Sequence, residues 1–109
     1  MNQINQVEKL NDYISTKQAV LVYFSGKNCS VCKDLKPKIK TAIEQNFPKI
    51  ELYEVKCDLY KEIASSFSVF SIPTILVFFD SKEFKRYGRN ISIYQFIDEI
   101  KRPYTLLMD

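Results

Sequence analysis

The sequence predicts an α/β fold in which a central mixed β-sheet is flanked by helices on both faces. Two observations predict this fold. Strand-like and helix-like segments alternate through the first two thirds of the chain, and two strands joined by a tight turn follow them. Helical crossovers make the early strands parallel, and the late hairpin adds an antiparallel pair. At 109 residues the chain favours one domain, residues 1–109.

The first half of the chain supplies two strands and two helices. A short strand near residues 3–4 precedes a helix over residues 6–15, in which apolar residues recur at helical spacing. Residues 19–25 are a continuous β-favouring run, typical of a strand buried on both faces. After Cys29, a long helix presents one apolar stripe: Val31, Leu35, Ile39, Ala42, Ile43 and Phe47. Pro37 lies within this helix and should kink it, because its ring lacks an N–H and crowds the preceding turn.

The second half supplies the remaining strands. Residues 50–57 are predicted to form a strand and residues 60–67 a short helix. Residues 74–79 form the next strand, and a tight turn over residues 80–82 leads into an antiparallel partner over residues 83–87.

A final helix begins after Ser92. Gln95 stands three residues later and completes a capping box, and apolar residues at helical spacing form the buried face. We expect Pro103 to end this helix, because proline disrupts a helix interior. Residues 103–109 then form a tail beyond the last helix, apolar enough to pack back onto the body of the domain.

Composition restricts the function. Hydrophobic residues make up 46% and charged residues 27% of the chain, as in soluble globular proteins. The net charge of +3 is too small to indicate nucleic-acid binding, and the lysines between residues 33 and 40 are read as a solvated helix face. The N-terminal residues resemble neither a signal peptide nor a membrane span, so we expect a cytoplasmic protein that does not bind membranes.

The cysteines are the residues most indicative of chemistry. Cys29 and Cys32 form a C-x-x-C motif where a buried strand meets a helix. Free N–H groups and the positive end of the helix dipole would stabilise a thiolate at Cys29. Cys32 lies one turn further along, within the separation that a disulfide needs. We therefore predict that Cys29 attacks a disulfide and that the less exposed Cys32 resolves the mixed disulfide.

Other interpretations of the cysteines stay open. Both residues of the pair can be buried and inert, and Cys57 is most simply a buried hydrophobic residue. A zinc site within one chain is disfavoured, because zinc takes four ligands and the chain has three cysteines and no histidine. Two chains could still share a metal between their cysteine pairs.

The motifs and the order of elements together resemble the thioredoxin family over nearly the whole chain. The segment VYFSGKNCSVCK matches the family's strand, loop and redox motif, and Pro37 matches the proline of its active-site helix. SIPT at residues 71–74 matches the loop that carries a cis-proline, and Gly88 matches the glycine between the last strand and the last helix.

This resemblance implies a thioredoxin fold and a thiol–disulfide oxidoreductase. It places Pro73 beside the cysteines with a cis peptide bond, and it makes Ile72, Pro73 and Gly88 substrate-binding residues. The backbone of Ile72 would pair with an extended substrate chain. The implied partners are proteins that contain disulfides and a separate reductase, with no resident cofactor and no metal. We expect a monomer.

Four positions depart from the family's pattern. Asn28 stands where the family usually has tryptophan, which changes the docking surface, and Ser30 and Val31 replace the usual glycine and proline between the cysteines. Tyr23 replaces a buried aspartate that accepts the proton of the second cysteine. Glu54 or Asp58 is a candidate substitute, because acid–base help requires hydrogen-bond reach or one bridging water.

Three functions remain as hypotheses. The first is a cytosolic oxidoreductase that reduces protein disulfides through a Cys29/Cys32 dithiol–disulfide cycle. The second is an interaction module that keeps the fold without general reductase activity. The third is a metal-bridged dimer.

Overall fold

The computed structural model describes residues 1–108, which form five strands and four helices. In chain order these are β1 (Asn2–Gln3), α1 (Val7–Thr16), β2 (Ala19–Ser25), α2 (Ser30–Asn46), β3 (Glu51–Lys56), α3 (Lys61–Ser66), β4 (Thr74–Phe79), β5 (Lys82–Tyr87) and α4 (Ile93–Met108). The predicted order of elements is confirmed. Within the described residues, every helix is too short or too polar to cross a membrane.

The strands form one mixed sheet in the order β1-β3-β2-β4-β5. β1 and β2 both pair in parallel with β3, whereas β4 is antiparallel to β2 and β5 is antiparallel to β4. Every residue of the central strand β2 is buried, as its continuous β-favouring run predicted. The predicted mixed sheet is therefore confirmed.

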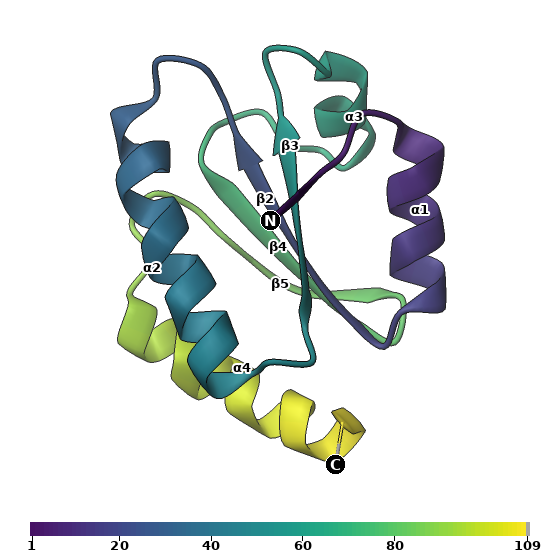
Figure 1. Cartoon of the computed structure of the whole chain (residues 1–109), viewed down its shortest axis with the longest axis vertical. Coiled ribbons are helices and arrows are strands. Elements are labelled where there is room, and N and C mark those ends of the chain that lie inside the picture. Colours follow the sequence, from purple (N-terminus) through teal and green to yellow (C-terminus); the bar gives the residue numbers. More distant parts are fainter. Residues whose placement is uncertain (109) are drawn as a thin grey trace.

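Two helices cover each face of the sheet (Figure 1). Side chains alternate across β2, so Leu21 and Tyr23 face α2 and α4, whereas Val22 and Phe24 face α1 and α3. β2 and β3 run upward in Figure 1 toward the edge at which α2 begins. Their carboxyl ends thus meet the amino end of α2, which is where the cysteine motif lies.

The prediction that Pro103 ends the last helix is wrong. α4 begins after Ser92, whose Oγ accepts the N–H of Gln95 at 3.2 Å, and it continues through Pro103 to Met108. The segment beyond Pro103 is thus the end of α4 rather than a tail, and Asp109 lies outside the described residues.

Tertiary contacts explain why α4 continues. The Tyr104 ring lies 5.0 Å from that of Phe47, centroid to centroid, and its hydroxyl accepts the N–H of Lys49 at 3.1 Å. Lys49 Nζ also donates to the carbonyl of Met108 at 3.0 Å. An interior proline costs a helix about 3 kcal/mol, and burying apolar side chains of this size offsets such a cost.

Candidate active site

The two cysteines of the motif are bonded at the amino end of α2. Cys29 is the N-cap residue, its Cα lies 5.3 Å from that of Cys32, and the two sulfurs form a disulfide. Cys29 Sγ also accepts the N–H of Cys32 at 3.2 Å. The sulfur therefore accepts a hydrogen bond from one of the amides that open the helix, the groups expected to stabilise a thiolate in the reduced state.

The two sulfurs differ in exposure. Cys29 is half-buried, whereas Cys32 is only 3% exposed and packs into the core beneath α2. A substrate can thus approach Cys29 but not Cys32. This difference supports the assignment of attack to Cys29 and of resolution to Cys32.

The loop between β2 and α2 requires close packing and an unusual backbone. A Cβ on Gly26 would lie 2.6 Å from Cδ1 of Ile72, so a larger residue there would require the end of the Ile72 side chain to shift. Asn28 has a φ of 59°, a conformation that asparagine tolerates better than most residues. Asp58 Oδ1 accepts the N–H of Lys27 at 3.1 Å and ties the loop to the end of β3.

Of the predicted substrate-binding residues, Ile72 lies against this loop at Gly26. The Ile72–Pro73 peptide bond is cis, and Ile72 and Cys29 pack against the same buried cluster. Within residues 1–108 neither the N–H nor the carbonyl of Ile72 has a hydrogen-bond partner. Both groups can pair with an extended chain, although their role in substrate binding stays a prediction.

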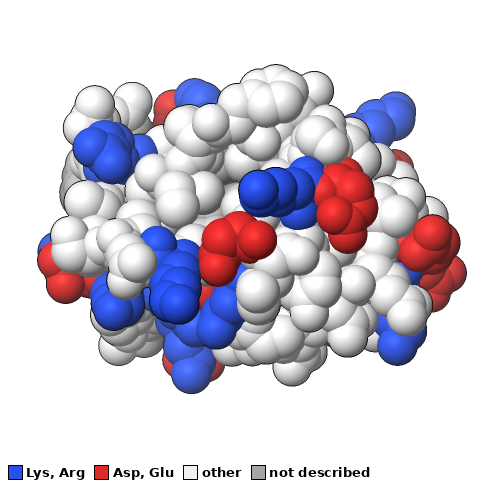
Figure 2. All heavy atoms as spheres, turned by 90° about the horizontal axis from the view of Figure 1, so that it is seen from above, with Lys and Arg blue, Asp and Glu red and all other residues white. Residues whose placement is uncertain are grey.

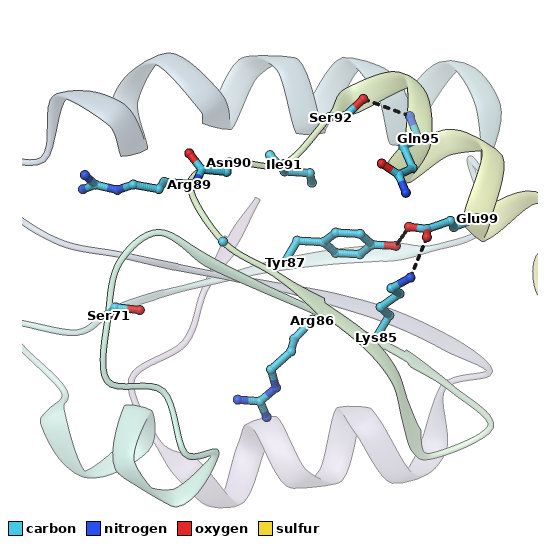
Figure 3. A pocket seen from close by; sticks show the side chains of 11 residues that line it. Ser71, Lys85, Arg86, Tyr87, Arg89, Asn90, Ile91, Ser92, Gln95 and Glu99 are labelled. Atoms are coloured by element: carbon cyan, nitrogen blue, oxygen red, sulfur yellow. Dashed lines mark hydrogen bonds and ion pairs between the residues drawn. The ribbon is translucent and has the colours of Figure 1, made fainter.

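Gly88 lines a hollow of about 540 Å³ together with Ser71, the residue before Ile72. Figure 3 shows this hollow at the end of β5, where the Tyr87 hydroxyl donates to Glu99 at 2.9 Å. The structure thus brings Ser71 and Gly88 to one hollow, and the role of Gly88 in substrate binding stays a prediction.

Known proteins similar to this chain identify its family. The family model described as Thioredoxin matches residues 2–102. The chain belongs to the thioredoxin family. The thioredoxin-like protein YdfQ of Bacillus subtilis is 31% identical over 106 residues, which cover 97% of this chain and 94% of that protein. Thioredoxin of Mycoplasma genitalium is 30% identical over 86 residues, 79% of this chain and 83% of that protein.

Solved structures agree on the fold. Mitochondrial thioredoxin 3 of Saccharomyces cerevisiae superposes with a TM-score of 0.81 at 19% identity, over 93% of each chain. Thioredoxin of Fasciola hepatica gives a TM-score of 0.76 at 25% identity, over 94% of this chain and 98% of that one. Membership of the thioredoxin family, together with the bonded C-x-x-C pair, supports thiol–disulfide oxidoreductase activity.

Tyr23 does not supply the acid–base group of the thioredoxin-family aspartate that it replaces. Its fully buried hydroxyl donates to the carbonyl of Cys32 at 2.7 Å. Burial, and then the charge of Glu54, raise the pKa of Tyr23 to about 12, so it stays protonated at neutral pH. Tyr23 therefore holds the first turn of α2 against β2.

Glu54 lies next to Tyr23 in the sheet and is only 3% exposed. Oε1 accepts hydrogen bonds from Lys36 Nζ at 2.7 Å and Gln3 Nε2 at 2.6 Å, and Oε2 accepts one from Ser25 Oγ at 2.7 Å. Burial by itself would raise the pKa of Glu54, but these hydrogen bonds outweigh it and lower the pKa. Because a good proton acceptor has a pKa near the working pH, Glu54 is a weak base.

Asp58, the other candidate acceptor, is exposed and holds the backbone of Lys27. Proton acceptance by Glu54 or Asp58 stays a prediction.

Cys57 is half-buried rather than fully buried, and it is a free thiol. Burial, and then the neighbouring charge of Asp58, raise its pKa to about 11. Its thiol is thus almost entirely protonated at neutral pH and is a poor nucleophile. The sequence predicted a buried hydrophobic residue at this position, and the structure leaves it partly exposed.

The face around the active-site edge carries charges of both signs. Figure 2 looks down on this edge, with basic side chains gathered on the left of the view and acidic ones among them and on the right. Within residues 1–108, no three side chains of His, Cys, Asp or Glu are grouped so that they could hold a metal ion.

Sequence reasoning did not single out Gly26 or the hydroxyl contact of Tyr23. The signal for Gly26 was its rarity, since the chain has two glycines and one of them stands three residues before Cys29. The sequence carries no signal for the hydrogen bond of the Tyr23 hydroxyl, because the acceptor is a backbone carbonyl nine residues away.

Proposed function

We propose that the protein reduces disulfides in other proteins through a Cys29/Cys32 dithiol–disulfide cycle. The observation that carries the proposal is the placement of the pair: a half-exposed sulfur at a helix terminus, bonded to a buried sulfur, beside the unpaired backbone of Ile72. An extended substrate chain would pair with that backbone and lay its disulfide against Cys29.

Two exchanges complete the reaction. The Cys29 thiolate attacks one substrate sulfur, a mixed disulfide forms, and the other substrate sulfur leaves as a thiolate that takes a proton from solvent. Cys32 then loses its proton and attacks Cys29 Sγ, which releases the second substrate thiolate and leaves the Cys29–Cys32 disulfide. Two electrons pass to the substrate, and a separate reductase restores the dithiol.

Reduction of insulin by dithiothreitol tests this function. We expect the wild-type protein to accelerate the reaction and Cys29→Ser to leave only the uncatalysed rate, with Cys57→Ala, which removes the third thiol but keeps a small apolar side chain, as the matched control that retains activity. A wild-type rate no faster than that of Cys29→Ser would favour an interaction module instead, an alternative that rests on Asn28 in place of the family's tryptophan.

The reduction potential of the pair tests the direction of electron flow. We propose a reductant in the cytosol, where a reducing thiol pool suits a working dithiol and a free Cys57. Equilibration with glutathione should give a reduction potential of about −270 mV for a reductant, whereas a value of about −120 mV would indicate an oxidant. Fluorescence microscopy of the tagged protein tests the location.

A further inference from the structure

A second hollow adjoins Ile72 on the α3 side of the sheet. Its volume is about 350 Å³, and its lining includes Cys57 at the end of β3, Lys61 and Ser65 of α3, and Phe70 and Ile72 of the loop before Pro73. Lys61 is the single charged residue among them. The hollow is therefore suited to an apolar group.

Ile72 connects this hollow to the disulfide. Its side chain lines the hollow, its Cδ1 lies against Gly26 of the active-site loop, and it packs on the same cluster as Cys29. Its N–H and carbonyl are unpaired within residues 1–108. A chain that pairs with Ile72 thus passes both the reactive sulfur and the mouth of the hollow.

Phe70 marks the rim of the hollow. Its side chain is 84% exposed, whereas five of the eight phenylalanine residues of the chain are buried. An exposed aromatic ring beside an apolar hollow is typical of a surface that binds another molecule. Phe70 can cover a side chain that enters the hollow.

Cys57 forms one wall without competing for the substrate disulfide. Its thiol is half-buried and stays protonated at neutral pH, so it behaves as a small apolar group. A reactive thiol at this position would exchange with the bound substrate. The nonreactive one contributes contact area alone.

We propose that this hollow binds an apolar side chain of the substrate, two residues away from the cysteine that Cys29 attacks. The inference rests on the proposed function. In an extended chain, alternate side chains point to the same side, about 6.6 Å apart for residues i and i+2. When the substrate cysteine points at Cys29, the side chain two residues along points at the same protein surface. A leucine, isoleucine, methionine or phenylalanine there would be buried against Phe70 and Cys57.

Disulfide-containing peptides test this proposal. The set carries Leu or Ser two residues before the reactive cysteine, or two residues after it, and a small aromatic disulfide without a peptide serves as the reference substrate. With turnover supported by dithiothreitol, we expect kcat/KM to be about tenfold higher for Leu than for Ser at one of the two positions.

Two variants test whether the hollow causes the preference for Leu over Ser. Phe70→Ala removes the rim and should reduce the Leu-to-Ser ratio to about two. Ser65→Trp fills the hollow from the exposed face of α3 and should abolish the ratio while Phe70 is still present. Tyr94→Ala removes an aromatic residue of similar exposure, 85%, from α4 and should leave the ratio unchanged.

The outcomes separate this proposal from the proposed function. Equal rates for Leu and Ser at both positions, or a preference that survives both variants, would overturn the assignment of the hollow. Reduction of the small aromatic disulfide in that case would still support the oxidoreductase. Failure to reduce either kind of substrate would overturn the proposed function itself.

Discussion

Cys29 follows β2 and Cys57 follows β3, so both cysteines lie at the ends of neighbouring strands. Their surroundings have opposite effects, since one favours a thiolate and the other a protonated thiol. The Cys57 N–H donates to the carbonyl of Ser25 at 2.8 Å, so the ends of β2 and β3 are adjacent. Cys29 caps a helix of 17 residues and accepts an N–H from it. Cys57 instead follows a strand, next to Asp58, and burial and that charge hold it protonated. Nearness to the active-site edge therefore does not make a cysteine reactive; the groups around the sulfur do.

The carboxylates near the two cysteine sites, Glu54 and Asp58, also differ in burial and in the number of their hydrogen-bond partners. Glu54 beneath α2 is buried and receives hydrogen bonds from three side chains, including Lys36 of the active-site helix. Asp58 beside Cys57 is exposed and has no ion-pair partner within residues 1–108. Glu54 thus fastens α2 to the sheet, whereas Asp58 acts on its neighbours through its free charge and its contact with Lys27.

The largest expected effect separates the catalytic pair from Cys57. Cys32→Ser removes the resolving sulfur, so substrate should accumulate as a mixed disulfide on Cys29 and turnover should fall by at least about 100-fold. Cys57→Ala, which keeps a small apolar side chain, should keep turnover within about twofold. Mass spectrometry of the trapped species and steady-state insulin reduction measure the two effects. A mixed disulfide that accumulates on Cys57 instead of Cys29 would contradict the assignment of Cys29 as the attacking cysteine.

Alkylation rates sharpen the same contrast. In the reduced protein at pH 7, Cys29 should react with iodoacetamide about 50-fold faster than Cys57. A pKa of about 11 leaves about one Cys57 thiol in 10,000 ionised, and the greater nucleophilicity of that thiolate recovers only part of the difference. Peptide mapping after timed quenching gives both rates. Similar rates would show that the helix terminus does not activate Cys29.

Glu54→Gln tests how much the interaction of Glu54 with Lys36 of α2 stabilises the fold. The amide keeps the shape but loses the charge that Lys36 and Ser25 stabilise, so the free energy of unfolding at pH 7 should fall by about 1–2 kcal/mol. Because folding lowers the pKa of Glu54, its ionisation stabilises the protein above the unfolded pKa of about 4.3, and this stabilisation is lost as the pH falls through the folded pKa.

Urea unfolding of both proteins at pH 7 and at pH 3 measures this difference, which should shrink at pH 3. The matched control is Glu51→Gln, which removes a carboxylate that is 42% exposed in its pair with Lys17 and should cost less than about 0.5 kcal/mol. Equal losses for the two variants would contradict the role assigned to Glu54. Disulfide exchange by Glu54→Gln between pH 6 and pH 9 also tests whether Glu54 accepts a proton.

The smallest expected effect comes from Asp58→Asn. The amide oxygen can still accept the N–H of Lys27, but the charge that helps to raise the pKa of Cys57 is gone. Alkylation of Cys57 at pH 8 should become about two- to threefold faster. Glu62→Gln removes an exposed charge from α3 and should leave the rate unchanged. A Cys57 rate that Asp58→Asn leaves unaltered would assign the raised pKa to burial alone.

The sequence by itself determined the order of the elements, the place of the cysteine pair and the loop of Pro73. Local patterns encode these features: the buried run of β2, the apolar stripe of α2 and the spacing of Cys29 and Cys32 depend on neighbours in the chain. The start of α2 after Cys29 and the presence of a tight turn before β5 follow from the same short-range chemistry.

Only the tertiary structure decided the rest. The sequence predicted that Pro103 ends the last helix, but packing of Tyr104 against Phe47 allows the helix to continue. The sequence showed only that Tyr23 replaces an aspartate, whereas the structure shows its hydroxyl donating to the carbonyl of Cys32. Glu54 acquires three partners from three different elements, and Ile72 meets Cys57 in one hollow across the loop before Pro73. The physical reason is the same throughout: burial and hydrogen bonding between residues distant in the chain outweigh local preferences of a few kcal/mol.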